Sequence, residues 1–172
     1  MRAINVFISG ITFIITSFSV HADYTVDMGT VRSVSPQDVV ITISKNPMGH
    51  TEEVCLALTM AQILRQSGRK VNVTVFLRND GVFLADDETV TSVTEQCVVP
   101  DPEHPNMPML ISLKDNLVAF IADNQNNLVN CPLCWGARVQ GGYIADPNPD
   151  YGVLASEAVP PLLLGADKVI DF

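Results

Sequence analysis

Two β-branched runs separated by an amphipathic segment dominate the first half of the chain. Residues 38–44 and 71–77 are apolar runs bounded by turn-forming residues, so each predicts a buried strand. Residues 51–68 carry apolar side chains at helical spacing on more than one face, with Thr51 as the predicted cap and Gly68 as the predicted stop. A strand, a helix and a strand at this spacing predict a right-handed crossover in a parallel sheet.

The second half of the chain predicts shorter elements. Residues 85–106 are acidic and contain prolines, which predicts a long loop, and Pro108 is expected to open a second helix. Residues 128–129 predict a brief strand in front of two cysteines. A short helix from about Ser156 to Leu164 then leads to a last strand at residues 168–172. Because there is no internal repeat, the pattern predicts a single α/β domain with a mostly parallel sheet.

The N-terminus has the pattern of a secretory signal. Arg2 precedes a mostly apolar stretch, Ile4 to Val20, and small or aliphatic residues precede a predicted cleavage after Ala22. The alternative is a permanent membrane anchor, but the stretch is close to the lower limit of ~17 residues for a span and contains polar residues. We therefore expect three parts: a signal peptide at residues 1–22, a leader at residues 23–37 and an α/β domain at residues 38–172. The mature protein is expected to be periplasmic or secreted, with no stable membrane insertion after cleavage.

The charge balance excludes one class of partner. Cleavage removes a single charged side chain, that of Arg2, and leaves nine Lys and Arg against nineteen Asp and Glu, a net charge of −10. Nucleic-acid binding depends on clustered basic side chains that displace counterions from phosphates. The sequence contains no such cluster, so we expect no nucleic-acid partner.

The segment VNCPLCWGARVQGG, residues 129–142, carries the candidate chemistry. Pro132 suits the first position of a helix, which makes Cys131 the predicted N-cap and places Cys134 one turn further on the same face. The main-chain N–H groups and the dipole at that helix end favour the thiolate form of Cys131. Arg138, one more turn along, is expected to add positive potential. The pair therefore predicts an activated thiol, Cys131, and a second thiol, Cys134, that resolves it.

Two other interpretations of the cysteine pair stay open. A permanent disulfide would close so short a loop that its entropic contribution would be modest. A zinc site would need two more ligands, and the remaining candidates are scattered along the chain: Cys55, Cys97, His50 and His104. We expect no metal and no cofactor.

Three further side chains are candidates for supporting roles. Trp135 stands beside the thiols, where it would close the pocket or simply pack. His50 follows the first predicted strand, where it would face the site or the solvent. Cys97 lies in the predicted acidic loop, and it would pair with Cys55, approach the motif as a third thiol, or stay free. Cys55 itself is expected to be a small buried side chain.

The order of these elements resembles the DsrE/DsrF-like family of sulfur-relay proteins. The matching segments are the strand Val39–Ser44, the helix ending at Gly68, the strand Val71–Leu77 with Gly81-Val-Phe-Leu84, the strand end Leu128-Val-Asn-Cys131 followed by Cys134 and Ala137-Arg138, and the closing Ala166–Phe172. The resemblance covers nearly all of residues 38–172. It implies a flavodoxin-like three-layer fold, homo- or hetero-oligomers, and a persulfide carried at Cys131, with Cys134 matching a second cysteine that some members have.

Two features depart from the family pattern. Val139 replaces the glycine that often follows the Ala-Arg pair, and the predicted signal peptide separates this chain from members that work in the cytoplasm. The substrates of those members are therefore not carried over to this chain.

The leading hypothesis is an exported DsrE-like protein that handles sulfane sulfur through Cys131 and Cys134, as a carrier or a transferase. Its expected partners are sulfur donors and acceptors, either small molecules or proteins, and further copies of the chain. The alternatives are a thiol–disulfide oxidoreductase of protein thiols, and a non-enzymatic binding or assembly subunit in which the pair is a structural disulfide.

Overall fold

The computed structural model describes most of the chain from Pro36 onward. The described residues are 36–67, 70–101, 103–104, 107–123, 127–144, 148 and 151–172. The predicted signal peptide, the predicted leader up to residue 35, and Gly68 lie outside the described residues. In the part of the chain that is described, no helix is long and apolar enough to cross a bilayer.

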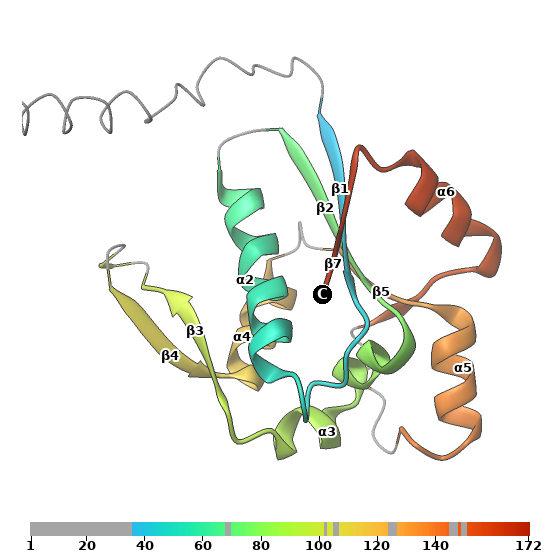
Figure 1. Ribbon diagram of the computed structural model, residues 1–172, viewed down its shortest axis with the longest axis horizontal. Coiled ribbons are helices and arrows are strands. Elements are labelled where there is room, and N and C mark those ends of the chain that lie inside the picture. The colour runs from blue at the N-terminus through green and yellow to red at the C-terminus, as the bar shows by residue number, and fades with distance from the viewer. Residues whose placement is uncertain are drawn as a thin grey trace, which may run out of the picture. The chain divides into compact units, whose positions relative to one another are not determined.

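Among the described residues, five parallel strands form the central sheet. They are β1 (Gln37–Ile43), β2 (Val71–Leu77), β5 (Asn127–Asn130), β6 (Gly152–Val153) and β7 (Lys168–Asp171). Their order across the sheet is β6-β5-β2-β1-β7 (Figure 1). β1 and β2 pair over their full length, from Gln37 opposite Val71 to Ile43 opposite Leu77. This confirms the predicted crossover unit and the mostly parallel α/β sheet.

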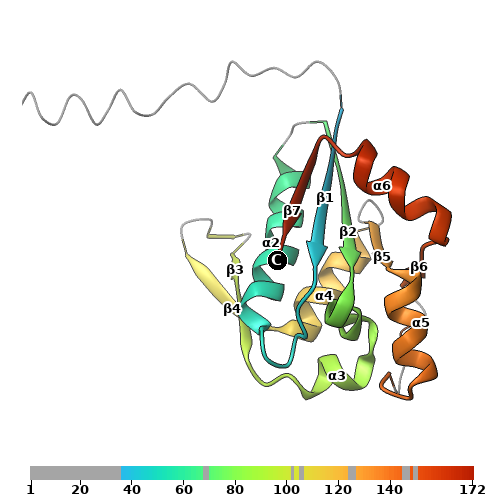
Figure 2. The ribbon, with the colours of Figure 1, turned by 45° about the vertical axis from the view of Figure 1, so that its right-hand side comes forward.

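Helices cover both faces of this sheet. They are α2 (Thr51–Gln66), α3 (Asp87–Ser92), α4 (Leu113–Ala122), α5 (Pro132–Gln140) and α6 (Val159–Gly165), with 3-10 turns η1 (Asn79–Ala85) and η2 (Ser156–Ala158). Figures 1 and 2 show α2 and α4 on one side of the sheet and α5 and α6 on the other. The fold is therefore the three-layer, flavodoxin-like arrangement that the family resemblance implied.

The main core lies between the sheet and the α2–α4 layer. Alternate residues of the two central strands point into it and are at most 5% exposed: Val39, Ile41, Ile43, Val73, Val75 and Leu77. The α2 side chains that meet them are Val54, Ala57, Leu58 and Ala61. The second apolar face of α2 is not equally buried, because Leu56 and Ile63 are about half exposed.

The prediction of a long loop at residues 85–106 is wrong. The segment contains α3 and the strand β3 (Gln96–Pro100), which pairs antiparallel with β4 (Pro108–Ser112) in a separate two-stranded sheet. The helix expected to open at Pro108 begins at Leu113 instead, after Ser112, whose Oγ accepts a hydrogen bond from the Asp115 N–H at 3.0 Å. A short apolar run does not distinguish strand from helix by its period, which explains the error.

Candidate functional site

The carboxyl ends of β2 and β5 lie side by side and lead into the two turns that form the candidate site. Leu77 stands opposite Asn130, and the Cys131 N–H donates to the Leu77 carbonyl at 2.8 Å, which extends the pairing by one residue. From there the chain after β2 enters η1, and the chain after β5 enters α5. Reactive groups gather at this edge of open parallel sheets, because strand ends and helix starts meet there.

Cys131 is the N-cap of α5, as the sequence predicted. Pro132 occupies the first helical turn, and the Trp135 N–H donates to the Cys131 carbonyl at 2.9 Å to begin the helix. Within the described residues, the Cys131 side chain makes no capping hydrogen bond. Both Cys131 and Cys134 are free thiols and partly exposed. The thiol at the helix start is therefore available for chemistry.

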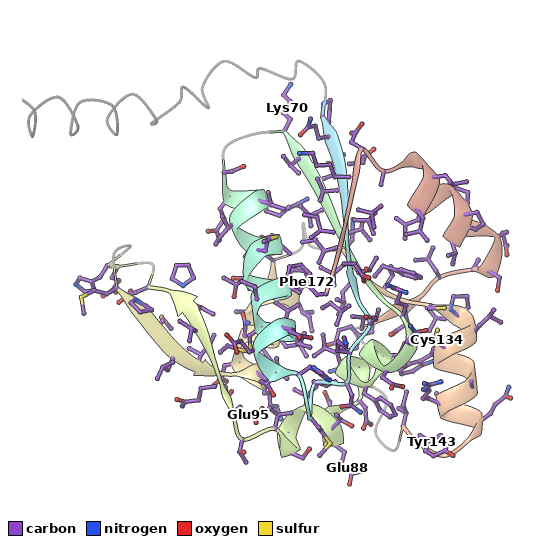
Figure 3. All side chains as sticks on the ribbon, viewed as in Figure 1. Lys70, Glu88, Glu95, Cys134, Tyr143 and Phe172 are labelled. Atoms are coloured by element: carbon purple, nitrogen blue, oxygen red, sulfur yellow. A yellow bond between two sulfur atoms is a disulfide. The ribbon has the colours of Figure 1, made fainter. Side chains whose placement is uncertain are left out.

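Cys134 lies one turn further along α5, against η1. Figure 3 shows it where the start of α5 faces the chain leaving β2. The main-chain N–H of Asn79 donates to Cys134 Sγ at 3.1 Å, and Asn79 Oδ1 lies 4.0 Å from the same sulfur. The Cys134 side chain also packs against the main core. The contacts with Asn79 in η1 and the packing against the main core therefore hold the Cys134 thiol in place.

The surroundings of Cys134 raise its pKa above that of a free thiol, so they favour the protonated form. Burial is the largest cause that raises the pKa of Cys134, and a hydrogen bond with Cys131 and the negative charge of Cys131 raise it further. The Asn79 N–H and the charge of Arg138 lower the pKa of Cys134 and oppose this effect. Because a charge on one sulfur disfavours a charge on the other, the pair is suited to one thiolate and one thiol.

Arg138 lies near the thiols, but its charge is shared with a carboxylate. Its Nη2 is 2.5 Å from Oδ1 of Asp80, and this contact raises the pKa of Arg138. The expected positive potential at Cys134 is therefore reduced by Asp80, a residue that sequence reasoning did not include in the site.

Trp135 and His50 have different surroundings. Trp135 is partly buried and packs against the main core, beside the thiols. His50 is the N-cap of α2, in place of the predicted Thr51, and its Nδ1 lies 3.4 Å from Glu53. It lines a hollow with Glu52 of α2 and with Glu95, the residue just before β3. The described contacts of His50 do not bring it to Cys131.

Cys97 does not belong to the candidate site. It forms a disulfide with Cys55, with an S–S distance of 2.05 Å, and this bond ties β3 to α2. The alternation of β3 turns Cys97 and Val99 inward and leaves Val98 exposed, so Cys97 faces α2. Cys55 is buried as expected, but as one half of this disulfide.

Sequence reasoning missed Asn79 and Asp80. The Asn-Asp-Gly sequence after β2 is typical of an ordinary turn, yet it stands at the carboxyl end of the strand next to β5. That position is the one signal that could have placed these residues in the site. Within the described residues, no group of three or more His, Cys, Asp or Glu side chains could hold a metal ion.

Comparison with known proteins supports the fold. No protein-family model matches the chain, and the search of curated proteins finds no match. Among solved structures, the chain is similar to the crystal structure of the YchN protein from E. coli, with a TM-score of 0.55 and 19% sequence identity. That similarity covers 79% of this chain and 99% of the other. The chain therefore has the DsrE-like fold that the sequence resemblance implied, and at this identity the likeness extends to the fold alone.

Proposed function

We propose that this protein is an exported DsrE-like sulfur-handling protein, in which Cys131 receives sulfane sulfur as a persulfide and Cys134 resolves it. The observation that carries the proposal is the placement of two free thiols one turn apart, with Cys131 at the N-cap of α5. A helix N-terminus favours a thiolate. The raised pKa of Cys134 keeps the second thiol protonated while the first one reacts.

The sulfur chemistry follows from these two roles. The Cys131 thiolate attacks the outer sulfur of a persulfide donor, R–S–SH, forms the S–S bond of Cys131–S–SH and releases the thiolate R–S⁻. An acceptor thiolate takes the outer sulfur and restores the Cys131 thiolate. When no acceptor is present, Cys134 loses its proton to solvent and attacks Cys131 Sγ, which forms the Cys131–Cys134 disulfide and releases HS⁻. The two thiols are then oxidised, the sulfane sulfur is reduced to sulfide, and an external thiol must reduce the disulfide before another cycle.

The Cys55–Cys97 disulfide supports an exported location. Such bonds persist in oxidising compartments and are rare in the cytosol. Together with the predicted signal peptide, the disulfide favours a periplasmic or secreted location. The proposed partners are sulfur donors and acceptors, with further copies of the chain as the family resemblance implies.

A thiol–disulfide oxidoreductase is the second candidate, and the spacing of Cys131 and Cys134 at a helix start favours it. The two functions are separated by incubating the reduced protein with polysulfide in one arm and with insulin disulfides in the other. Retention of an added sulfur atom supports the carrier. Rapid reduction of insulin without retained sulfur would contradict the carrier function and support the oxidoreductase function. A fixed disulfide in an assembly subunit predicts that the purified protein has no free thiols.

A further inference from the structure

Asn79 has an unusual backbone conformation at the edge of the thiol site. Among the described residues it is the one non-glycine residue with a positive φ, which is 49°. This left-handed region is uncommon for residues with a side chain, and Asn tolerates it better than most. Backbone outliers of this kind gather at functional sites, where the surrounding structure maintains them. The location of Asn79 therefore calls for a functional explanation.

The conformation of Asn79 directs its N–H toward the second thiol. Arg78 is still extended, and its N–H donates to the Ile43 carbonyl at 2.9 Å as β2 ends. The chain then turns at Asn79, and the Gly81 N–H closes the turn on the Arg78 carbonyl at 2.9 Å. The result is the 3.1 Å contact between the Asn79 N–H and Cys134 Sγ.

The Asn79 side chain offers the same sulfur a hydrogen-bond acceptor, whereas the main chain offers it a donor. Its Oδ1 lies 4.0 Å from Cys134 Sγ and can only accept a hydrogen bond, so it favours the protonated thiol. The main-chain N–H can only donate, so it favours the thiolate. Asn79 thus offers a hydrogen-bond partner to each protonation state of Cys134: Oδ1 to the thiol and the main-chain N–H to the thiolate.

We propose that Asn79 is the positioning residue of Cys134, and that it holds the sulfur in one place while the thiol loses its proton. A thiol that attacks a neighbouring sulfur reacts fastest when it is already in position, so a fixed location shortens the path to the Cys131–Cys134 disulfide. The description of Cys134 as the resolving thiol rests on the proposed function. The contact between Asn79 and Cys134 does not.

Other charged groups also act on Cys134 and must be held constant in a test. Cys131 and Arg138 lie on the same helix, and Asp80 acts through its contact with Arg138. Arg78 precedes Asn79, but its guanidinium is 2.6 Å from Asp171 on β7. Substitution of Asn79 alone leaves all of these groups in place.

The test measures the pH dependence of Cys134 alkylation by iodoacetamide in the Cys131→Ser protein, where Cys134 is the one thiol outside the disulfide. Asn79→Gly keeps the left-handed backbone and the N–H, whereas Asn79→Val strongly disfavours that backbone, and both lack Oδ1. We expect the alkylation midpoint of the glycine variant not to rise. The valine variant is expected to shift it upward by about one pH unit, because a hydrogen bond to the thiolate is lost.

Asn79→Asp is the variant that keeps the test decisive if Asn79→Val does not fold, because Asp also tolerates the left-handed region. Its carboxylate stands next to the sulfur and is expected to raise the midpoint by at least half a pH unit, about what a nearby like charge produces. An unchanged midpoint in a folded Asn79→Val protein, or in Asn79→Asp, would overturn the proposal. So would an equal rise in Asn79→Gly.

A second readout connects the contact to disulfide closure. In the protein with both thiols, Asn79→Val is expected to slow closure of the Cys131–Cys134 disulfide by diamide about tenfold at neutral pH, which corresponds to about one pH unit in thiolate population. Equal closure rates in Asn79→Val and Asn79→Gly would contradict a positioning role. Neither measurement uses a sulfur donor, so a failure of sulfur uptake and a failure of this proposal are distinguishable.

Discussion

The guanidinium of Arg138 and the carboxylate of Asp80 form an ion pair, with 2.5 Å between Nη2 and Oδ1. This contact ties α5, which carries both thiols, to the η1 turn after β2. Because Arg138 lowers the pKa of Cys134, the ion pair controls how much positive charge the thiol experiences.

Asp80→Asn is therefore expected to lower the pKa of Cys134, because Arg138 keeps its charge and loses its counter-ion. Arg138→Met is expected to raise it. Exposed charges interact by about 0.2–1 kcal/mol, and one pH unit corresponds to about 1.4 kcal/mol, so each shift should be roughly 0.1–0.7 pH units. The alkylation profile of Cys134 in the Cys131→Ser protein measures both. Shifts of the same sign in the two variants would contradict this role of the ion pair.

The Cys55–Cys97 disulfide is expected to stabilise the fold without taking part in sulfur chemistry. It closes a sequence separation of 42 residues and ties β3 to α2. Replacing both cysteines with alanine is expected to lower the free energy of unfolding by about 2–4 kcal/mol. Urea unfolding at neutral pH measures this loss. Sulfur uptake at Cys131 should remain in the folded double variant, and its disappearance there would show that Cys97 does belong to the reactive site.

Gly81 allows η1 to approach β1 closely. A Cβ at this position would lie 2.0 Å from the Ile43 carbonyl oxygen and 2.7 Å from its carbon, both main-chain atoms. We expect Gly81→Ala to lower the free energy of unfolding by about 1–3 kcal/mol and to move η1 away from Cys134. Urea unfolding measures the loss.

Gly136→Ala is the matched control for this change, because no heavy atom lies within 4 Å of the added Cβ and the residue is inside α5. Alanine should raise the free energy of unfolding by about 0.5–1 kcal/mol there. If both substitutions had the same effect, close packing at Gly81 would not be what positions η1.

Asp171 on β7 contacts Thr42 on β1 and Arg78, the residue after β2. These contacts make the stability of the fold depend on pH in the acidic range. The hydrogen bond from Thr42, and then the Arg78 guanidinium, hold the pKa of Asp171 below its ordinary value. A carboxylate whose pKa is lower in the folded state stabilises the fold above its unfolded value of about 3.9, and this contribution is lost as the pH falls through the folded value. Its side chain is 56% exposed, so the contribution should stay below about 1 kcal/mol.

Asp171→Asn should therefore lower the thermal midpoint slightly at pH 7 and flatten its fall below about pH 4. Thermal unfolding between pH 2 and pH 7 measures this, and Glu157→Gln, which removes one carboxylate on exposed η2, controls for net charge. An acid-induced fall as steep in Asp171→Asn as in the unchanged protein would contradict the assignment.

The sequence predicted the elements whose signals are local. The β-branched runs of β1 and β2 and the Cys-Pro step at Cys131 each carry their own physical reason, and the structure has them where they were expected. The β3–β4 hairpin was missed because the apolar residues 108–113 fit either a strand or the start of a helix.

The rest of the candidate site depends on tertiary contacts. Cys97 is 42 residues from Cys55, and its pairing follows from how β3 packs on α2. Asn79 and Asp80 meet α5 only because β5 pairs with β2, which no local pattern reveals. The left-handed backbone of Asn79 could not be distinguished from an ordinary turn in the Asn-Asp-Gly step.

The mass of the reduced protein after exposure to polysulfide tests the carrier role of Cys131 most directly. The unchanged protein, Cys131→Ser and Cys134→Ser are treated in parallel, freed of excess donor and weighed, and the added sulfur is located by peptide mapping. We predict one added sulfur atom on Cys131, retained longest in Cys134→Ser because no second thiol can release it as sulfide, and none in Cys131→Ser. Equal uptake by Cys131→Ser, or no uptake by Cys134→Ser, would contradict the carrier role.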